Sequence, residues 1–336
     1  MTDKTIKLGH GSGGKLTHEL IDEVLLRYFD SPLLAGLPDS ARVEMHGGPV
    51  AFTTDTFVVD PPFFPGGNIG KLATYGTVND IAVTGALPLF LSCGLILEEG
   101  FPESDLHKIL ASMQEAGRYA GVEVVTGDTK VVPRGKLDRI FINTAGIGIS
   151  RREGSLPAGE IRSEDVVLVS GPLGDHGAAV LSEREGLNLE SAILSDCAPV
   201  TDIAQTILQN AQRVPFLRDV TRGGLATILN EAVNDSDLGV ILQEDDIPVR
   251  PGVRSICELL GLDPLYLACE GRVVTVIDPD SSEGVLASLH KLGNGQDAAA
   301  VGKISAEYAE EVVVETHFGT HRLVQMLSGE QLPRIC

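Results

Sequence analysis

Alternation of apolar runs with helical patterns predicts an α/β sandwich in the first half of the chain. Residues 89–97 are almost entirely apolar, which is typical of a buried strand. The stretch that Pro102 opens has apolar residues three and four positions apart, as in an amphipathic helix. A further helical pattern spans residues 16–29, and another begins at Asn68. The predicted strands are residues 50–54, 89–97, 122–126 and 139–149.

A polar stretch divides the chain into two parts of similar size. Residues 151–164 include Gly154, Pro157 and Gly159, so we place the domain boundary there. A second α/β unit follows, which gives an expected α/β (α+β) fold of two domains. The expected units are residues 1–40 (a glycine-rich arm and a helix), 41–150 (the N-terminal domain), 160–327 (the C-terminal domain) and 328–336 (a mobile tail).

Composition excludes several classes of protein. The hydrophobic fraction of 43% is sufficient for two cores. The net charge of −21 argues against a general nucleic-acid binder and against binding to anionic membranes. No apolar run is long enough to cross a bilayer, and the first residues do not form a signal peptide, so we expect a cytoplasmic protein. An acidic chain that binds ATP must offset local repulsion with lysines, helix N-termini or a divalent metal.

The five cysteines do not form a zinc site, because no C-x-x-C pair is present. Four of them lie in apolar contexts and are expected to be buried small side chains: Cys93, Cys197, Cys257 and Cys269. Cys336 follows a polar stretch with Gly329 and Pro333, so it is expected to carry a thiol on a free tail. A frayed tail with an incidental cysteine is the alternative.

A glycine-rich segment near the N-terminus is a candidate phosphate site. Residues 9–15 nearly match a P-loop, but Leu16 replaces the hydroxyl residue that binds magnesium, so we reject the P-loop fold. Consecutive amides can still cradle phosphate oxygens, and a lysine adds positive charge. The candidate residues are Gly11, Gly13, Gly14 and Lys15. A flexible glycine loop is the alternative.

Acidic residues after predicted strands form a second group of candidates. Asp55 ends one such strand and Asp60 follows it. Asp80 lies inside a small, apolar helix, where a carboxylate requires a partner such as a metal or a phosphate–metal complex. Helix caps and turns are the alternatives. Asn79 precedes Asp80 in the same helix and is a further candidate. Other strand ends and glycine-rich helix starts add Asp128, Thr129, Lys130, Asp219 and Arg222.

Two further residues are candidates for acid–base chemistry. Glu270 directly follows an apolar run, and burial would raise its pKa toward that of a general base. A salt bridge to Arg272 is the alternative. His176 lies in a glycine-rich turn, where a single histidine is more commonly structural.

The sequence resembles the HypE family of hydrogenase maturation factors, within the AIR-synthase-like (PurM-like) ATP enzymes. The resemblance covers essentially the whole chain, and the C-terminal Pro-Arg-Ile-Cys is its most specific motif. The motifs that carry it are Gly9-His10-Gly11-Ser12-Gly13-Gly14, Thr54-Asp55-Thr56-Phe57, Val78-Asn79-Asp80-Ile81-Ala82, Thr126-Gly127-Asp128-Thr129-Lys130-Val131-Val132, Asp219-Val220-Thr221-Arg222-Gly223-Gly224, Ala268-Cys269-Glu270-Gly271-Arg272 and Pro333-Arg334-Ile335-Cys336.

This resemblance implies an ATP-driven dehydration. The carbamoyltransferase HypF would load a carbamoyl group onto Cys336, the tail would fold into the ATP site, and the product would be a thiocyanate that supplies cyanide to iron on a HypC–HypD complex. Phosphoryl transfer requires charge neutralisation. Glu270 would act as the base, and Lys130 would lie by the γ-phosphate or the carbamoyl oxygen. The expected Mg²⁺ ligands are Asp55, Asp60, Asp80, Asp128 and Asp219.

The resemblance also implies a homodimer whose N-terminal sheets form a barrel, with ATP near the interface. Two other readings stay open at this point. A selenophosphate synthetase or a thiamine monophosphate kinase would share the aspartates, but neither needs Cys336, and the N-terminal glycine loop holds Ser12 rather than a cysteine. A noncatalytic carrier would only display the tail.

Overall fold

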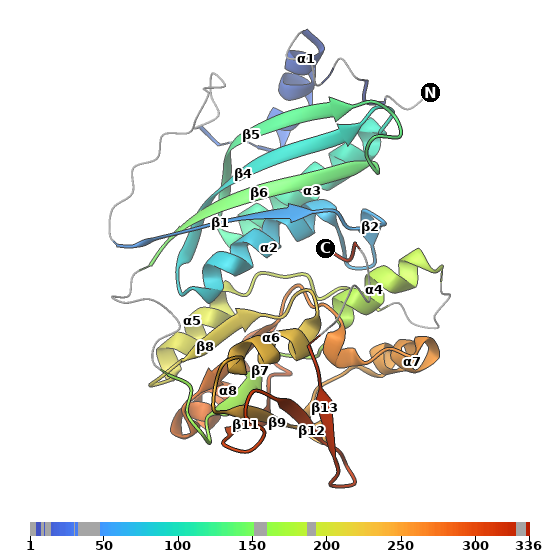
Figure 1. The fold of residues 1–336 in the computed structure, drawn as a ribbon. Helices are drawn as coiled ribbons and strands as arrows, with labels where there is room; N and C mark the ends of the chain where they lie inside the picture. The colour runs from blue at the N-terminus through green and yellow to red at the C-terminus, as the bar shows by residue number, and fades with distance from the viewer. Residues whose placement is uncertain are drawn as a thin grey trace.

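Two β-sheets, each covered by helices, organise the chain (Figure 1). The structure is a computed structural model and describes residues 5–7, 10, 15–29, 31–32, 48–150, 160–186, 193–326 and 334–336, without the side chains of residues 15–18. Helix α1 (Lys15–Glu23) and the 3-10 helix η2 (Leu25–Arg27) precede the first sheet. The chain's last residues lie between the two sheets, near β2 (Phe63–Phe64) and α4 (Asp175–Arg184).

The N-terminal sheet has the strand order β1-β6-β4-β5. Only β4 and β5 run parallel. Helices α2 (Ile69–Val83) and α3 (Glu103–Ala120) cover one face, and the short strand β3 (Gly67–Asn68) leads into α2. Alternate residues of β6 are buried, as expected for a sheet with one covered face. The strands are β1 (Val50–Phe57), β4 (Leu87–Glu98), β5 (Glu123–Val132) and β6 (Ile140–Ile149).

The other face of this sheet, here called the open face, has no helix of the described chain against it. Phe52 is 70% exposed there, Val50 54% and Ile96 39%. Asp128 and Lys130 of β5 lie on the same face, because β5 alternates and the intervening Thr129 is buried on the helix side. The open face therefore combines large apolar side chains with an ion pair.

The C-terminal sheet has seven strands in the order β13-β12-β9-β11-β7-β10-β8. Helix α6 (Gly224–Val233) packs on one face, and α5 (Thr201–Asn210) with α8 (Ser282–Leu289) packs on the other. Helix α7 (Pro251–Leu260) contacts α4. The strands are β7 (Val166–Val169), β8 (Phe216–Asp219), β9 (Gly239–Gln243), β10 (Val273–Ile277), β11 (Ala299–Ser305), β12 (Val312–Glu315) and β13 (His321–Val324).

Helix α2 lies between the N-terminal sheet and the C-terminal domain. Thirteen of its 15 residues are buried, so it has no solvent-facing stripe. The Asn68 side chain begins the helix by accepting hydrogen bonds from the amides of Gly70 and Lys71. On the sheet side, Gly146 and Gly148 of β6 leave room for α2, since a Cβ on Gly148 would lie 2.3 Å from Ile81 Cγ2. Close packing against β6 thus fixes the position of α2.

The predicted order of strands and helices in the first half is confirmed, but two predicted strand ends are wrong. Strand β1 continues past Asp55 to Phe57, because β6 pairs with it that far. Strand β5 continues past Thr126 to Val132, because β4 pairs with it residue by residue. Asp128, Thr129 and Lys130 therefore lie within a strand rather than in a loop at its end.

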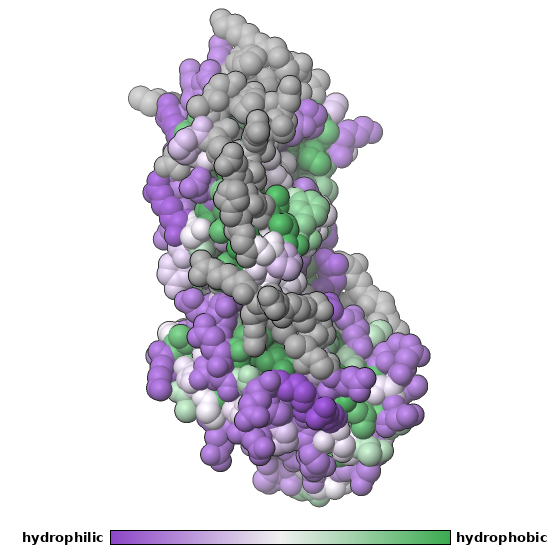
Figure 2. Space-filling model, turned by 90° about the vertical axis from the view of Figure 1, so that its left-hand side faces the viewer, coloured by the Kyte–Doolittle hydropathy of each residue, from purple (hydrophilic) through white to green (hydrophobic). Residues whose placement is uncertain are grey.

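The visible surface of the lower domain is largely hydrophilic (Figure 2). Figure 2 shows hydrophilic residues over most of the lower domain, with hydrophobic residues in small patches. None of the described helices is both long and apolar enough to span a membrane.

We predict that Gly148→Ala destabilises the protein by about 1–3 kcal/mol, because the added methyl group would overlap Ile81 and the Leu87 carbonyl beneath α2. Gly284→Ala in α8 is the matched control. No atom lies within 4 Å of that position, so the substitution should stabilise by up to about 1 kcal/mol. Chemical denaturation of both variants measures the difference, and equal midpoints would contradict the packing argument.

Candidate functional site

Carboxylates from both domains face one another where the domains meet. Asp55 lies on the helix side of β1, and Asp80 lies near the end of α2. Thr53, two residues before Asp55 on the same face, donates a hydrogen bond of 2.8 Å to Asp80 Oδ2. Asp219 ends β8, which contacts α2. Together with Glu270, these residues form what we call the carboxylate cluster (Asp55, Asp80, Asp219 and Glu270).

Burial raises the pKa of each member of the carboxylate cluster, and repulsion from neighbouring carboxylates raises the pKa of Asp55, Asp219 and Glu270 further. Burial is the larger cause for Asp55, and the charge of Asp80 adds to it. Burial also raises the pKa of Asp80, against the hydrogen bond from Thr53. For Asp219, burial and then Asp80 raise the pKa to about 7. Like charges at this density favour a bound cation.

Glu270 is the most deeply buried member, at 3% exposure. Burial, followed by the charges of Asp219 and Asp196, raises its pKa well above the usual value. Its Oε1 atom has no hydrogen-bond partner among the described residues. The main chain around it is fixed, since its amide donates to Asp196 Oδ1 (3.0 Å) and its carbonyl accepts from Asn79 Nδ2 (3.2 Å). The backbone is therefore held while the carboxylate stays available for a proton.

Asn79 joins the two domains. Its Nδ2 group donates to the carbonyls of Ala198 (3.1 Å) and Glu270 (3.2 Å), and its Oδ1 accepts from the amide of Val200 (2.9 Å). Both amide hydrogens are used in these bonds. The structure thus gives Asn79 a positioning role at the domain boundary, and its expected contact with ATP stays a prediction.

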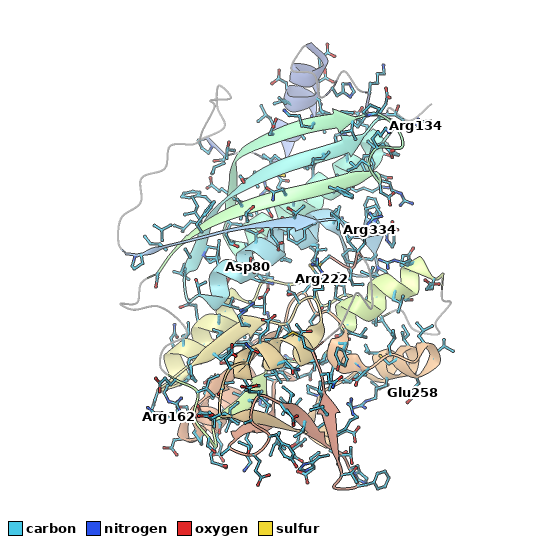
Figure 3. All side chains as sticks on the ribbon, viewed as in Figure 1. Asp80, Arg134, Arg162, Arg222, Glu258 and Arg334 are labelled. Atoms are coloured by element: carbon cyan, nitrogen blue, oxygen red, sulfur yellow. The ribbon has the colours of Figure 1, made fainter. Side chains whose placement is uncertain are left out.

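Cys336 lies beside the carboxylate cluster. Arg222, just after β8, donates a hydrogen bond of 3.0 Å from Nη2 to the Cys336 sulfur. Figure 3 shows Asp80 and Arg222 from different domains in the zone where the domains meet. Burial, followed by the charge of Glu270, raises the pKa of the Cys336 thiol to about 12, although Arg222 opposes the shift. The thiol in this position is protonated at neutral pH and is not an activated nucleophile.

The predicted residues of β5 lie away from the carboxylate cluster of the same chain. Strand β5 is three strands from β1 in the sheet, or about 14 Å at the usual strand spacing. Asp128 and Lys130 pair with each other at 3.0 Å on the open face. Thr129 is buried on the opposite face, so it does not lie with its neighbours. The structure therefore does not bring these three residues to Asp55 and Asp80 within one chain.

Asp60, another predicted metal ligand, contacts two arginines. Its carbonyl accepts from Arg184, and its carboxylate is 4.0 Å from Arg334. The structure therefore places Asp60 against residues 334–336. The glycine loop cannot be placed, because Gly11, Gly13, Gly14 and the side chain of Lys15 lie outside the described residues.

Other residues of the site were missed in the sequence. Thr53 orients Asp80, Asp196 fixes the amide of Glu270, and Arg184 contacts residues 334–336. Only Thr53 carried a signal, since it lies two positions before Asp55 on a predicted strand and therefore shares its face. Asp196 and Arg184 are far from these partners in sequence, and no local pattern predicts the contacts.

A pocket lies beside Asp80, which is the one member of the carboxylate cluster that lines it. It has a volume of about 260 Å³ and is lined by β1 residues, including Val50 and Thr53, and by Thr84 after α2. Within the described residues, no three histidine, cysteine or acidic side chains are close enough to hold a metal without other ligands. A cation here would thus need oxygen atoms from a bound ligand as well.

Comparison with known proteins identifies the fold. Residues 38–150 match the N-terminal domain of AIR synthase related proteins, and residues 162–315 match their C-terminal domain. The carbamoyl dehydratase HypE of Bradyrhizobium diazoefficiens is 48% identical over 332 residues, which cover 98% of this chain and 96% of that protein.

Solved structures agree with these matches. A crystal structure of the hydrogenase maturation protein HypE in complex with ATP is 47% identical, with a TM-score of 0.94 and coverage of 99% of this chain and 100% of that one. The HypE–HypF complex contains a chain that is 43% identical, with a TM-score of 0.79, and the match covers 92% of this chain and 99% of that one. The chain therefore belongs to the AIR synthase related family and, within it, to the HypE carbamoyl dehydratases.

Proposed function

We propose that this protein uses ATP to dehydrate a carbamoyl group carried on the sulfur of Cys336, forming a thiocyanate during hydrogenase maturation. The observation that carries the proposal is the position of the Cys336 sulfur, 3.0 Å from Arg222 and beside the carboxylate cluster. A cysteine in this place can present its own modified side chain as the substrate. The reaction is then intramolecular, which removes the entropic cost of a second encounter.

The chemistry balances as one dehydration per ATP. The carbamoyl oxygen attacks the γ-phosphate, ADP leaves, and the nitrogen loses its first proton. The C–O bond then breaks, phosphate leaves with the oxygen, and the nitrogen loses its second proton. The products are the thiocyanate, ADP and phosphate. Converting a poor leaving group into phosphate is the step that ATP makes possible.

Glu270 is the proposed base for the nitrogen protons. Its raised pKa gives the carboxylate a stronger affinity for a proton than an exposed glutamate has, and its Oε1 is unpartnered. Arg222 is proposed to hold the sulfur rather than a phosphate, since its Nη2 already contacts that atom. The proton acceptor and the group that holds the sulfur thus come from different segments of the C-terminal domain.

The donor set fits Mg²⁺, which binds carboxylate oxygens together with substrate phosphates and water. Asp55, Asp80 and Asp219 are the residues proposed to hold it, and the support is that the three carboxylates are partly or fully buried close together, where a cation would offset the cost of their charges. When bound, the metal would neutralise the negative charge of the triphosphate. Asp60 and Asp128 are less suitable as ligands in one chain, since arginine and lysine side chains contact their carboxylates.

We further propose that two copies pair through the open face. Leaving Phe52 and Ile96 of this chain in water is unfavourable, because exposed apolar area of this kind favours burial. Pairing would also give a role to Lys130 and Asp128. They lie about 14 Å from β1 in their own chain, but they could reach the carboxylate cluster of a second copy. Lys130 would then serve the γ-phosphate across the interface.

HypF is the proposed source of the carbamoyl group, and a HypC–HypD complex is the proposed acceptor of the cyanide. The structure of a relative with HypF supports the first assignment. The second rests on the resemblance to the HypE family, and the chemistry of the product agrees with it, because a thiocyanate needs an acceptor for its cyanide. A raised thiol pKa at the docked position supports loading elsewhere, since the thiolate is the form that reacts.

Intact-mass spectrometry with HypF, carbamoyl phosphate and ATP tests the proposed reaction. Cys336 should gain one carbamoyl group and then lose one water, only when Mg²⁺ and ATP are present. Glu270→Gln and Lys130→Ala should accept the carbamoyl group at the normal rate but lose water about 100-fold more slowly, because they lack the base and the cation. Water loss at the unchanged rate in either variant would contradict that residue's role.

Asp80→Asn should weaken ATP binding in the presence of Mg²⁺ by at least about tenfold, because the neutral amide cannot replace a charged ligand. Asp245→Asn is the control, since this aspartate is exposed and pairs with His317 far from the site. Isothermal titration calorimetry measures both affinities. Equal binding by the two variants would exclude Asp80 from the nucleotide site.

Phe52→Glu should convert a dimer into a monomer, because it places a charge in the centre of the proposed interface. Phe318→Glu is the matched control, since Phe318 is 88% exposed on the turn between β12 and β13. Light scattering after size-exclusion chromatography gives the two masses. A monomeric unchanged protein, or a dimeric Phe52→Glu variant, would show that the open face is not the interface.

A further inference from the structure

Three consecutive carbonyl groups hold residues 334–336 in place. The Cys336 carbonyl accepts from the amide of Val58 (3.1 Å), and the Arg334 carbonyl accepts from the amide of Asp60 (3.1 Å). On the other side, Arg184 donates to the Arg334 carbonyl at 2.8 Å. Because Val58 and Asp60 follow β1 while Arg184 ends α4, the tripeptide 334–336 is bound by both domains.

The middle carbonyl has a different donor. His176 Nε2 lies 2.8 Å from the Ile335 oxygen. A carbonyl can only accept, so Nε2 carries the hydrogen. His176 Nδ1 lies 2.8 Å from Ser195 Oγ. The Ser195 oxygen accepts a hydrogen bond of 3.1 Å from the amide of Cys197, which leaves its own hydrogen free to be donated. The Ser195 hydroxyl therefore donates to Nδ1 and fixes the tautomer that Ile335 requires.

The histidine is well held for this task. It is fully buried, and its ring makes an edge contact with Phe64 at a centroid distance of 5.2 Å. Burial lowers the pKa of His176, so the ring is neutral at neutral pH and can accept from Ser195. Ile335 itself is 3% exposed and packs into the N-terminal core. The His176 ring and the buried Ile335 side chain together fix the position of the tripeptide against the N-terminal core.

We propose that His176, oriented by Ser195, is a positioning residue that docks the tripeptide 334–336 through the Ile335 carbonyl and so places the Cys336 sulfur between Arg222 and Glu270. The recognition is through main-chain atoms and the Ile335 and Arg334 side chains. None of these contacts involves the sulfur, so the docking site accepts the tripeptide whether the sulfur is free or modified. The effect of docking on dehydration rests on the proposed function. Docking itself does not, because it can be measured on the free thiol.

The accessibility of Cys336 reports docking directly. The other four cysteines are at most 3% exposed, so iodoacetamide should modify Cys336 first in the folded protein. In the docked position the thiol is partly buried and bonded to Arg222, which slows its alkylation. The rate of alkylation, followed by intact mass, then measures how often the tripeptide leaves its site.

The test compares four full-length variants. His176→Leu removes the donor, and His176→Gln keeps an amide hydrogen near the position of Nε2. His290→Leu is the matched control, because His290 Nε2 makes a 2.8 Å contact with the Ala298 carbonyl that does not involve the tripeptide. Arg334→Ala weakens docking from the tripeptide itself, since it removes the bond to the Val58 carbonyl (2.9 Å) and the pairing with Asp138.

His176→Leu and Arg334→Ala should raise the alkylation rate of Cys336 roughly tenfold, the effect of one lost hydrogen bond at a buried carbonyl. His176→Gln and His290→Leu should stay close to the unchanged protein. Equal rates for His176→Leu and His290→Leu would overturn the proposal. So would alkylation of the unchanged protein at the rate found in denaturant. Since Arg334→Ala alters only the tripeptide, its result stands even if His176→Leu folds poorly.

A second measurement links docking to the reaction. After loading by HypF, His176→Leu should lose water roughly tenfold more slowly than the unchanged protein, whereas its loading rate should be unchanged. If the unchanged protein never loses water but His176→Leu still alkylates faster, the proposed function fails and the docking role stands. If both proteins lose water equally fast, the positioning role of His176 is overturned.

Discussion

The carboxylate cluster imposes the main constraint on this protein. Four acidic side chains are held in a partly buried space, where desolvation raises all four pKa values and repulsion adds to the shift for Asp55, Asp219 and Glu270. Interactions among the carboxylates do not stabilise this arrangement, because each side chain would move into water if the helix or strand that carries it could shift. Apolar packing unrelated to the acids must therefore hold the elements in place, and the free energy that it supplies is partly offset by the repulsion.

Helix α2 is where this packing is concentrated. Its apolar residues contribute to the N-terminal core on one side, and Ala82 and Val83 contribute to the C-terminal core on the other. Asn79 adds directional bonds to segments that carry Glu270 and Val200. Asp80 follows Asn79 directly. The same turn of α2 therefore positions one carboxylate and bonds to the C-terminal domain, which carries Asp219 and Glu270. The geometry of the site and the joint between the domains are thus set together.

The sequence predicted what depends on local pattern. The order of elements in the first half, the helix that begins at Asn68 and the burial of four cysteines follow from periodicity and caps. The grouping of Asp55 and Asp80 was also expected. Strand ends were less predictable, since pairing with a neighbouring strand extended β5 through Asp128 and Lys130. Contacts such as those of Asp196 with Glu270, or Arg184 with Arg334, join distant segments and leave no local signal.

The bonds that hold the tripeptide 334–336 are all made within one chain, and this has a kinetic meaning. A free tripeptide would lose much of its binding free energy to the entropic cost of association, but a segment of the same chain is present at a high effective concentration. Weak intrinsic affinity is then sufficient for occupancy, and it keeps the residence time short. A substrate carrier that must visit a second protein between turnovers benefits from both properties. Tighter contacts would lengthen each visit to the site and slow the exchange between partners.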